Sequence, residues 1–236
     1  QVATPQPPSP TVLSPATSTS PSQLSEGTVR SARIVVSDDS LWASHSPSKS
    51  VIGLSLPKGD RMWKTSIECE PTMLTRLYSR LFVTCFNTGE LIVLDARDGE
   101  LLKKRWVGHG VFGVIGNGSR LYISVSHEKY IIVLDAVTLE EIARARTGNG
   151  PRGLALKGNR LYVVHLIDAS VRVFDAATLS VLGSISIGLQ AGLAESVTLD
   201  PHKARAYVPH QRHHITNMAR LFDSTIFPTV SVLDTE

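Results

Sequence analysis

The sequence predicts an all-β fold, a β-propeller of four-stranded antiparallel blades, from three observations. A pattern of Leu, an aromatic residue and two smaller residues returns every 40 residues, with its second position varying, at Leu41–Ser44, Leu81–Thr84, Leu121–Ser124 and Leu161–Val164. An apolar segment follows each pattern about ten residues later, at Val51–Ser55, Leu91–Asp95, Ile131–Asp135 and Val171–Asp175. No apolar period of about 3.6, which would indicate a helix, appears in the repeat. A repeat of this length is typical of a propeller blade, which buries its faces against its neighbours.

Each unit is expected to contain four short strands, lettered A to D from the propeller axis outward. In the fourth unit, which has the clearest turns, they are Gly153–Leu156, Arg160–His165, Ser170–Asp175 and Val181–Ile187. The blades are expected over about residues 31–68, 69–108, 109–148 and 149–190, followed by an incomplete blade over 191–236. The sequence thus predicts an incomplete ring of about five blades, four of them full and the fifth with three strands.

Two columns of the repeat hold residue types that favour turns. The first is an acidic residue at the end of strand C, which accepts a backbone N–H and begins the next turn: Asp95, Asp135 and Asp175. The second is a glycine at the end of strand D, where a positive φ is expected: Gly108, Gly148 and Gly188.

The first thirty residues differ from the rest. They contain six prolines and eleven Ser or Thr residues, with Glu26 and Arg30 as the only charges. Such a segment cannot bury apolar surface, so residues 1–30 are expected to be a disordered, Pro/Ser/Thr-rich spacer. Spacers of this kind often join an export or anchoring signal to a folded domain; a linker remnant is the alternative.

Composition and motifs argue against nucleic-acid binding, a membrane-spanning segment and several known kinds of enzyme. The net charge is +3 and no basic run accompanies it, so nucleic acid is not an expected partner. No apolar stretch approaches about 18 residues, so no transmembrane segment is expected. No Cys-x-x-Cys-His, Gly-x-Ser-x-Gly, P-loop or His-Glu-x-x-His motif occurs, so the sequence carries no strong enzyme signature.

The repeat resembles the YVTN-type β-propeller repeat, found in YncE-like envelope proteins. The fourth unit matches best, from Gly150-Pro151 through Leu161-Tyr162-Val163 and Val171–Asp175 to Gly188. The first unit departs from the pattern, with Ser55 in place of Asp and Glu68 in place of Gly. The resemblance covers residues from about 31 onward and implies a propeller that serves mostly as a platform for interactions.

The fifth unit is altered. Strand C, Val230–Asp234, begins 23 residues after Tyr207, whereas Val171 lies nine residues after Tyr162. The difference predicts a 14-residue insertion between strands B and C, at roughly residues 210–227. Insertions in repeats tend to mark the binding face. An incomplete ring would leave apolar blade faces open, so the rest of the propeller or another subunit is expected to pack there.

Histidines are predicted to gather on one propeller face. The D–A and B–C connections share a face, and only His202 falls on the other one. Two or three imidazoles in the inserted segment, His210, His213 and His214, could bind a transition metal or offer an axial ligand to a haem; solvated loop histidines are the alternative. The candidate binding face contains His45, His109, His127, His165, His210, His213 and His214.

Two cysteines are predicted to form a disulfide. Cys69 precedes strand A of the second unit and Cys85 ends its strand B, so both lie at the same end of a hairpin. An oxidised pair would agree with an exported protein, in the periplasm, at the cell surface or secreted. Two reduced thiols are the alternative.

Two functions are compatible with these features. The first is an exported scaffold that docks a protein or ligand on the histidine-bearing face, without catalysis. The second is the propeller portion of an extracytoplasmic redox complex, as in the methylamine dehydrogenase heavy chain or propellers linked to c-type cytochromes. The segment from His210 through Asn217, Phe222 and Phe227-Pro228 resembles the cytochrome-linked group. No cofactor is evident in this chain; a haem c or metal would belong to a cytochrome partner or to further sequence.

Overall fold

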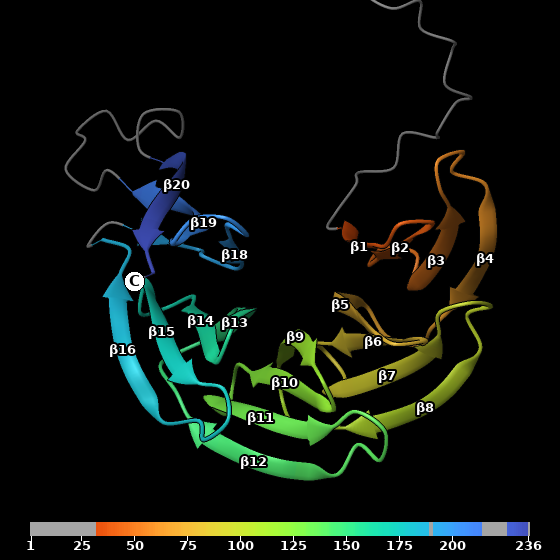
Figure 1. Ribbon diagram of the computed structural model, residues 1–236, viewed down its shortest axis with the longest axis horizontal. Helices are drawn as coiled ribbons and strands as arrows, with labels where there is room; N and C mark the ends of the chain where they lie inside the picture. Colours follow the sequence, from red (N-terminus) through yellow and green to blue (C-terminus); the bar gives the residue numbers. More distant parts are fainter. Residues whose placement is uncertain (1–31, 189–190, 214–225, 236) are drawn as a thin grey trace, which may run out of the picture.

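The computed structural model describes residues 32–188, 191–213 and 226–235, which form five antiparallel sheets arranged around a common axis (Figure 1). The predicted all-β propeller is therefore confirmed. The described residues contain no helix, and so none of a length and apolarity that could span a membrane. The spacer expected over residues 1–30 lies outside the described residues.

In the first four blades the order of strands in each sheet follows their order in the chain. Blade 1 contains β1 (Ala32–Val36), β2 (Ser40–His45), β3 (Ser50–Ser55) and β4 (Arg61–Ser66). Blade 2 contains β5 (Pro71–Leu77), β6 (Arg80–Cys85), β7 (Glu90–Asp95) and β8 (Leu101–Trp106). Blade 3 contains β9 (Val111–Asn117), β10 (Arg120–Val125), β11 (Tyr130–Asp135) and β12 (Glu141–Arg146). Blade 4 contains β13 (Pro151–Lys157), β14 (Arg160–His165), β15 (Ser170–Asp175) and β16 (Val181–Ser186).

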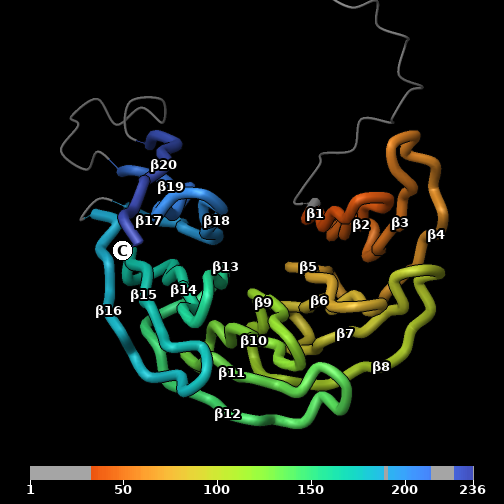
Figure 2. Tube along the Cα trace, viewed as in Figure 1, coloured from red at the N-terminus to blue at the C-terminus, as the bar shows by residue number. Residues whose placement is uncertain are grey.

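The apolar core lies between neighbouring blades. Figure 2 shows that, in blades 1 to 4, the first strand lies nearest the centre and the fourth strand lies on the rim. Phe82 and Leu91 of blade 2 pack in one buried cluster with Leu121 and Ile132 of blade 3. Each such side chain stabilises the fold by roughly 1.5–3 kcal/mol when fully buried. The period-two alternation of the strands therefore serves two interfaces at once, one on each face of the sheet.

Backbone hydrogen bonds fix which connections share a face. In blade 4 the N–H of Leu166, between β14 and β15, donates to the carbonyl of Gly150, which precedes β13, at 2.8 Å. We call this side the B–C face; it carries the B–C and D–A connections. On the opposite A–B face, the N–H of Ala176 donates to the carbonyl of Asn159, also at 2.8 Å. The sorting of connections expected from the repeat is thus what the backbone shows.

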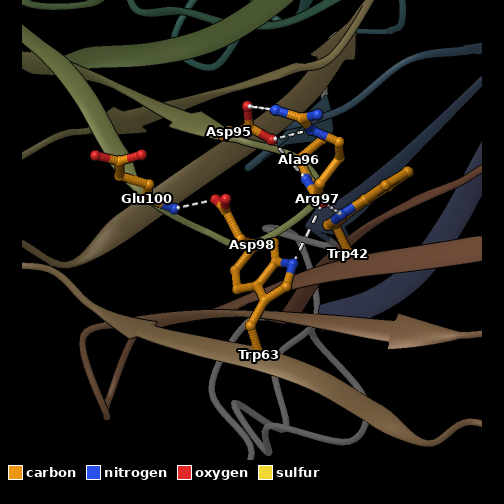
Figure 3. A network of polar contacts seen from close by, with 7 residues as sticks. All are labelled: Trp42, Trp63, Asp95, Ala96, Arg97, Asp98 and Glu100. Atoms are coloured by element: carbon orange, nitrogen blue, oxygen red, sulfur yellow. Dashed lines mark hydrogen bonds and ion pairs between the residues drawn. The ribbon is translucent and has the colours of Figure 1, made fainter.

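A polar network fastens blade 1 to blade 2 on the A–B face (Figure 3). The indole N–H groups of Trp42 and Trp63 both donate to the carbonyl of Ala96, at 2.8 and 3.3 Å. Beside it the Asp95 carboxylate accepts the backbone N–H of Arg97 at 2.8 Å and pairs with its guanidinium. Asp135 and Asp175 cap the same turn in blades 3 and 4, which confirms the role predicted for this column.

The positive φ expected for the glycine column holds at one of its three positions. Gly188 has a φ of 131°, but Gly108 and Gly148 lie outside the positive-φ region. At Gly148 a Cβ would overlap the Asp168 carboxylate and come within 2.8 Å of the His165 ring. Close approach of the D–A connection to the B–C turn, rather than a left-handed backbone, therefore requires glycine there.

The fifth blade confirms the predicted insertion and shows its form. Its strands are β17 (Ala191–Gly192), β18 (Thr198–Leu199), β19 (Arg205–His213) and β20 (Ile226–Asp234). The extra residues lengthen the β19–β20 hairpin, because both strands have nine residues where their counterparts have six. The short strands β17 and β18 pair with different stretches of β19, on the edge opposite β20.

The first and last blades each present an apolar face that no described residue covers. The blades follow an arc, and blades 1 and 5 stand on the two sides of its opening (Figure 1). Ile34 in β1 is 58% exposed and Val232 in β20 is 56% exposed. The matching positions inside the arc are buried: Leu74 and Val114 for Ile34, and Val93 and Val133 for Val232. The outer faces of blades 1 and 5 are therefore built like blade interfaces.

Candidate functional site

A pocket of about 200 Å³ opens on the B–C face near the axis, where the innermost strands begin. Its walls come from all five blades, so it exists only when the blades assemble around the axis. We call it the axial pocket. The residues that give it chemical character are Arg33, Glu70, Phe86, Phe112, Arg152 and Glu195.

Hydroxyl groups of one blade hold the wall of the next. Thr84 Oγ1 in β6 donates to the carbonyl of Phe112 in β9, at 2.5 Å. Ser124 Oγ, the equivalent atom in β10, donates to the carbonyl of Arg152 in β13, at 2.6 Å. Ser124 Oγ also accepts the N–H of Gly113 at 2.7 Å. These bonds fix the backbone from which Phe112 and Arg152 reach the pocket.

Arg152 is the central cation of the pocket. Its guanidinium carbon lies 4.7 Å from the ring centre of Phe86 and 4.3 Å from that of Phe112. The two rings pack edge to face, with centres 6.2 Å apart. Burial lowers the pKa of Arg152, and the carboxylate of Glu195 acts in the opposite direction. Arg152 Nε is buried and has no hydrogen-bond partner among the described residues. A buried donor without a partner costs free energy that a ligand could recover.

Three further charges surround this cation. The guanidinium of Arg33 in blade 1 lies 3.9 Å from the carboxylate of Glu195 in blade 5. This ion pair joins the first and last blades across the axis. The Nε of Arg33 is also buried without a partner among the described residues. The side-chain amide of Asn87 donates to the Glu70 carboxylate at 3.3 Å. The four ionisable groups therefore sum to no net charge, but their donors and acceptors are not all mutually satisfied.

The histidines expected on this face do not meet at one point. His127 packs its ring against Phe86, with centres 5.1 Å apart, and so touches the wall of the axial pocket. His109 packs against Trp106 at 5.5 Å. His45 Nδ1 is 2.6 Å from the hydroxyl of Ser48 in its own turn. The backbone N–H of His127 donates to the carbonyl of His109 at 3.4 Å, but no contact among the described residues joins either of them to His45.

His165 is fully buried and ties two connections of blade 4 together. Its Nε2 accepts the N–H of Gly148 at 3.0 Å and lies 2.6 Å from Thr147 Oγ1. Burial lowers its pKa to about 4, so the ring is neutral at physiological pH. Because Nε2 accepts, the proton of the neutral ring sits on Nδ1, which has no partner among the described residues. Its contacts are those of a structural residue.

Two of the three histidines in the inserted segment, His210 and His213, lie within the described residues. His210 is buried, with Nε2 2.9 Å from Ser231 Oγ and Nδ1 3.1 Å from the carbonyl of Gln211. His213 lies three residues further along the same strand, so its side chain leaves the opposite face of the sheet. His214 lies outside the described residues. Within the described part, no group of three His, Cys, Asp or Glu residues is arranged to hold a metal ion.

The predicted disulfide is confirmed. Cys69 and Cys85 are bonded, with Cα atoms 5.8 Å apart, and both sulfur-bearing side chains are buried. The bond ties the D–A connection before β5 to the end of β6, beside the pocket residues Glu70 and Phe86.

The sequence did carry a signal for the axial pocket. Thr72, Phe112 and Arg152 occupy one repeat column, 40 residues apart, at the start of strand A. This column changes from a hydroxyl to an aromatic ring to a cation, whereas strand B keeps Leu at its second position, as Leu81, Leu121 and Leu161. A column that varies inside a regular repeat indicates a site where each blade contributes something different.

Comparison with solved structures places the fold among known propellers. Hydrazine synthase from Kuenenia stuttgartiensis matches with a TM-score of 0.77 and 19% identity, over 86% of this chain and 62% of that one. BamB from Moraxella catarrhalis matches with a TM-score of 0.62 and 17% identity, over 86% of this chain and 57% of that one. The computationally designed Ika8 protein matches with a TM-score of 0.62 and 14% identity, over 85% of this chain and 57% of that one.

The chain is a β-propeller. It spans less than two thirds of the length of each of these structures. The identities are low, so the likeness establishes the fold alone. No family model matches the chain, and no curated protein matches its sequence. The comparisons therefore support a propeller but leave the finer YVTN assignment as a resemblance.

Proposed function

We propose that this chain is an extracytoplasmic β-propeller module that docks a partner on its B–C face, over the axial pocket. One observation carries the proposal: five blades converge on a pocket whose central guanidinium has a buried N–H that no described residue satisfies. A purely structural arginine would be expected to satisfy its donors within the fold. Docking platforms place such groups where a partner completes their hydrogen bonds.

The extracytoplasmic placement is supported by the disulfide between Cys69 and Cys85. Such bonds persist in oxidising compartments and are rare in reducing ones. The Pro/Ser/Thr-rich composition of residues 1–30 fits a tether or spacer outside the cytoplasm.

A second contact is proposed at the outer faces of blades 1 and 5. Exposed apolar residues there, Ile34 on one side and Val230 and Val232 on the other, match the columns that bury blade against blade elsewhere. Further blades, from the same protein or from another subunit, would cover these faces and close the ring.

Site-specific photo-crosslinking in cells that express the protein natively tests the docking proposal. A photoreactive residue at Thr88, in the exposed B–C turn of blade 2, is expected to capture one protein species. The matched control is Lys58, in the exposed C–D turn of blade 1 on the A–B face. Equal capture from both positions, or capture from Lys58 alone, would contradict the proposal.

The second candidate function is the propeller portion of an extracytoplasmic redox complex that exchanges electrons through a c-type cytochrome. The observation that favours it is the long β19–β20 hairpin, which carries His210 and His213. In this case the haem would belong to the partner or to further sequence. An absorption spectrum of the native complex without a Soret band would exclude this candidate.

A further inference from the structure

The axial pocket combines three properties that rarely occur together by chance. It contains a guanidinium, Arg152, whose Nε–H is buried and has no partner in the described part of the chain. The guanidinium packs against the aromatic rings of Phe86 and Phe112, at 4.7 and 4.3 Å, which leaves its N–H edge as the direction for hydrogen bonding. The volume of about 200 Å³ is below the usual range for drug-sized ligands, so only a small group fits.

We infer that the axial pocket binds a single small carboxylate, which accepts paired hydrogen bonds from the guanidinium of Arg152. The inference deepens the proposed function and rests on it, because it names the chemical group that the B–C face would recognise. The carboxylate is either that of a free small acid or the C-terminal carboxylate of a docked peptide. Both sources present the same planar pair of oxygens.

Geometry favours an anion with two oxygens on one edge, such as a carboxylate, over a spherical anion such as chloride. A guanidinium fork matches two coplanar oxygens and forms parallel hydrogen bonds with them. Phe86 and Phe112 restrict the orientation of the Arg152 guanidinium, so this side chain loses little additional freedom when a ligand binds.

Charge favours a monoanion over a dianion. The carboxylates of Glu70 and Glu195 also line the pocket. Glu195 already has Arg33 at 3.9 Å, and Glu70 accepts from Asn87 at 3.3 Å, so neither is satisfied by Arg152. A second negative charge on the ligand would meet both of them at short range, which disfavours phosphate and sulfate.

The opposing interpretation is that Arg152 serves only to pack between Phe86 and Phe112. Under that interpretation a substitution would change stability and leave no specific anion effect. Under the binding interpretation, carboxylate affinity depends on the guanidinium even when the substituted chain is fully folded. The two are separated by measuring binding and folding on the same variants.

Isothermal titration of the full chain with sodium acetate and propionate, against sodium chloride and sodium phosphate at equal ionic strength, provides the test. The ligands have few atoms, so a Kd of about 1 mM is expected. Arg152→Gln should weaken acetate binding by about tenfold or more. The acetate affinity of Arg152→Lys should lie between those of the unaltered chain and Arg152→Gln, because lysine keeps the charge but lacks the guanidinium fork. Arg97→Gln removes the same charge from the A–B face and should leave binding unchanged.

Three outcomes overturn the inference: no heat beyond the chloride control at about 50 mM acetate, equal affinity in Arg152→Gln, or phosphate binding as tightly as acetate. Should Arg152→Gln fail to fold, saturation-transfer NMR on the unaltered chain provides the test. Saturation transfer from the protein to the acetate methyl group is expected, and its absence would contradict the inference. A tripeptide with a free C-terminus, compared with its amidated form, distinguishes a peptide source from a free acid. Crosslinking from Thr88 does not depend on these titrations, so a failure here leaves the docking proposal separately testable.

Discussion

The phenolic hydroxyl of Tyr122 donates a 2.9 Å hydrogen bond to the carbonyl of Ala176, which fastens β10 of blade 3 to the C–D turn of blade 4. Trp42 makes the equivalent bond from blade 1 to Ala96 of blade 2. Phe82 occupies the same column in blade 2 but has no donor, and there Arg80 donates to the carbonyl of Ala136 at 3.2 Å instead. The blades are thus joined by side-chain donors as well as by apolar contacts.

Removing one of these bonds should destabilise the fold by a measurable amount. Tyr122→Phe leaves the Ala176 carbonyl without its side-chain donor in a buried interface, and we expect a loss of about 1–2 kcal/mol in the free energy of unfolding. Urea denaturation monitored by tryptophan fluorescence measures the loss. Tyr162→Phe is the matched control, because the Tyr162 hydroxyl has no partner among the described residues, and it should cost less. Equal losses would contradict the assigned role.

The disulfide should contribute stability through its short loop. Cys69 and Cys85 are 16 residues apart, which corresponds to about 3 kcal/mol in the chain-entropy model. Thiol labelling of the denatured, unreduced protein should find no free thiol. Labelling of both cysteines in protein purified from its native compartment would contradict the bond and remove the main support for an extracytoplasmic location.

His165 should make stability depend on acidity. Its pKa is about 4 in the fold and about 6.5 when exposed, so below pH 6.5 the unfolded chain binds a proton that the folded chain does not. Stability therefore falls as the pH drops from about 6.5 to about 4, by up to about 3 kcal/mol.

The substitution His165→Gln tests this dependence. The Gln side chain can still accept the N–H of Gly148 but does not titrate, so the acid dependence of the unfolding free energy should flatten in this pH range. The same substitution at His45, in the equivalent position of blade 1, provides the control and should leave the dependence in place. An unchanged pH profile in His165→Gln would refute the assignment.

Much of this architecture could be predicted, and the limits have physical causes. The strand positions of blade 4 match because alternation and turn residues are local signals. The disulfide could be predicted because a hairpin places Cys69 and Cys85 at the same end. The axial pocket was missed because Arg33 and Glu195 are far apart in the sequence and become neighbours only through the curvature of the whole arc. The gathering of histidines on one face could be predicted from the repeat, but the burial that makes His165 structural depends on packing that the repeat alone does not give.

Close packing of the innermost strands gives a further prediction. A Cβ at Gly113 in β9 would overlap the carbonyl of Arg152 in β13, whereas one at Gly183 in β16 would meet nothing within 4 Å. Gly113→Ala should destabilise the chain by about 1–3 kcal/mol, because backbone cannot move aside without displacing a blade. Gly183→Ala should be neutral or slightly stabilising, since it lowers the entropy of the unfolded chain. Thermal unfolding of both variants compares them directly, and a harmless Gly113→Ala would show that the strands are further apart.

A structure of the protein purified from its native source with its bound partner decides where docking occurs. Density for the partner should lie over the B–C face and reach Arg152 through the mouth of the axial pocket. A partner seated on the A–B face, over turns such as that of Asp95, with the pocket left open to solvent, would contradict the function proposed for this propeller.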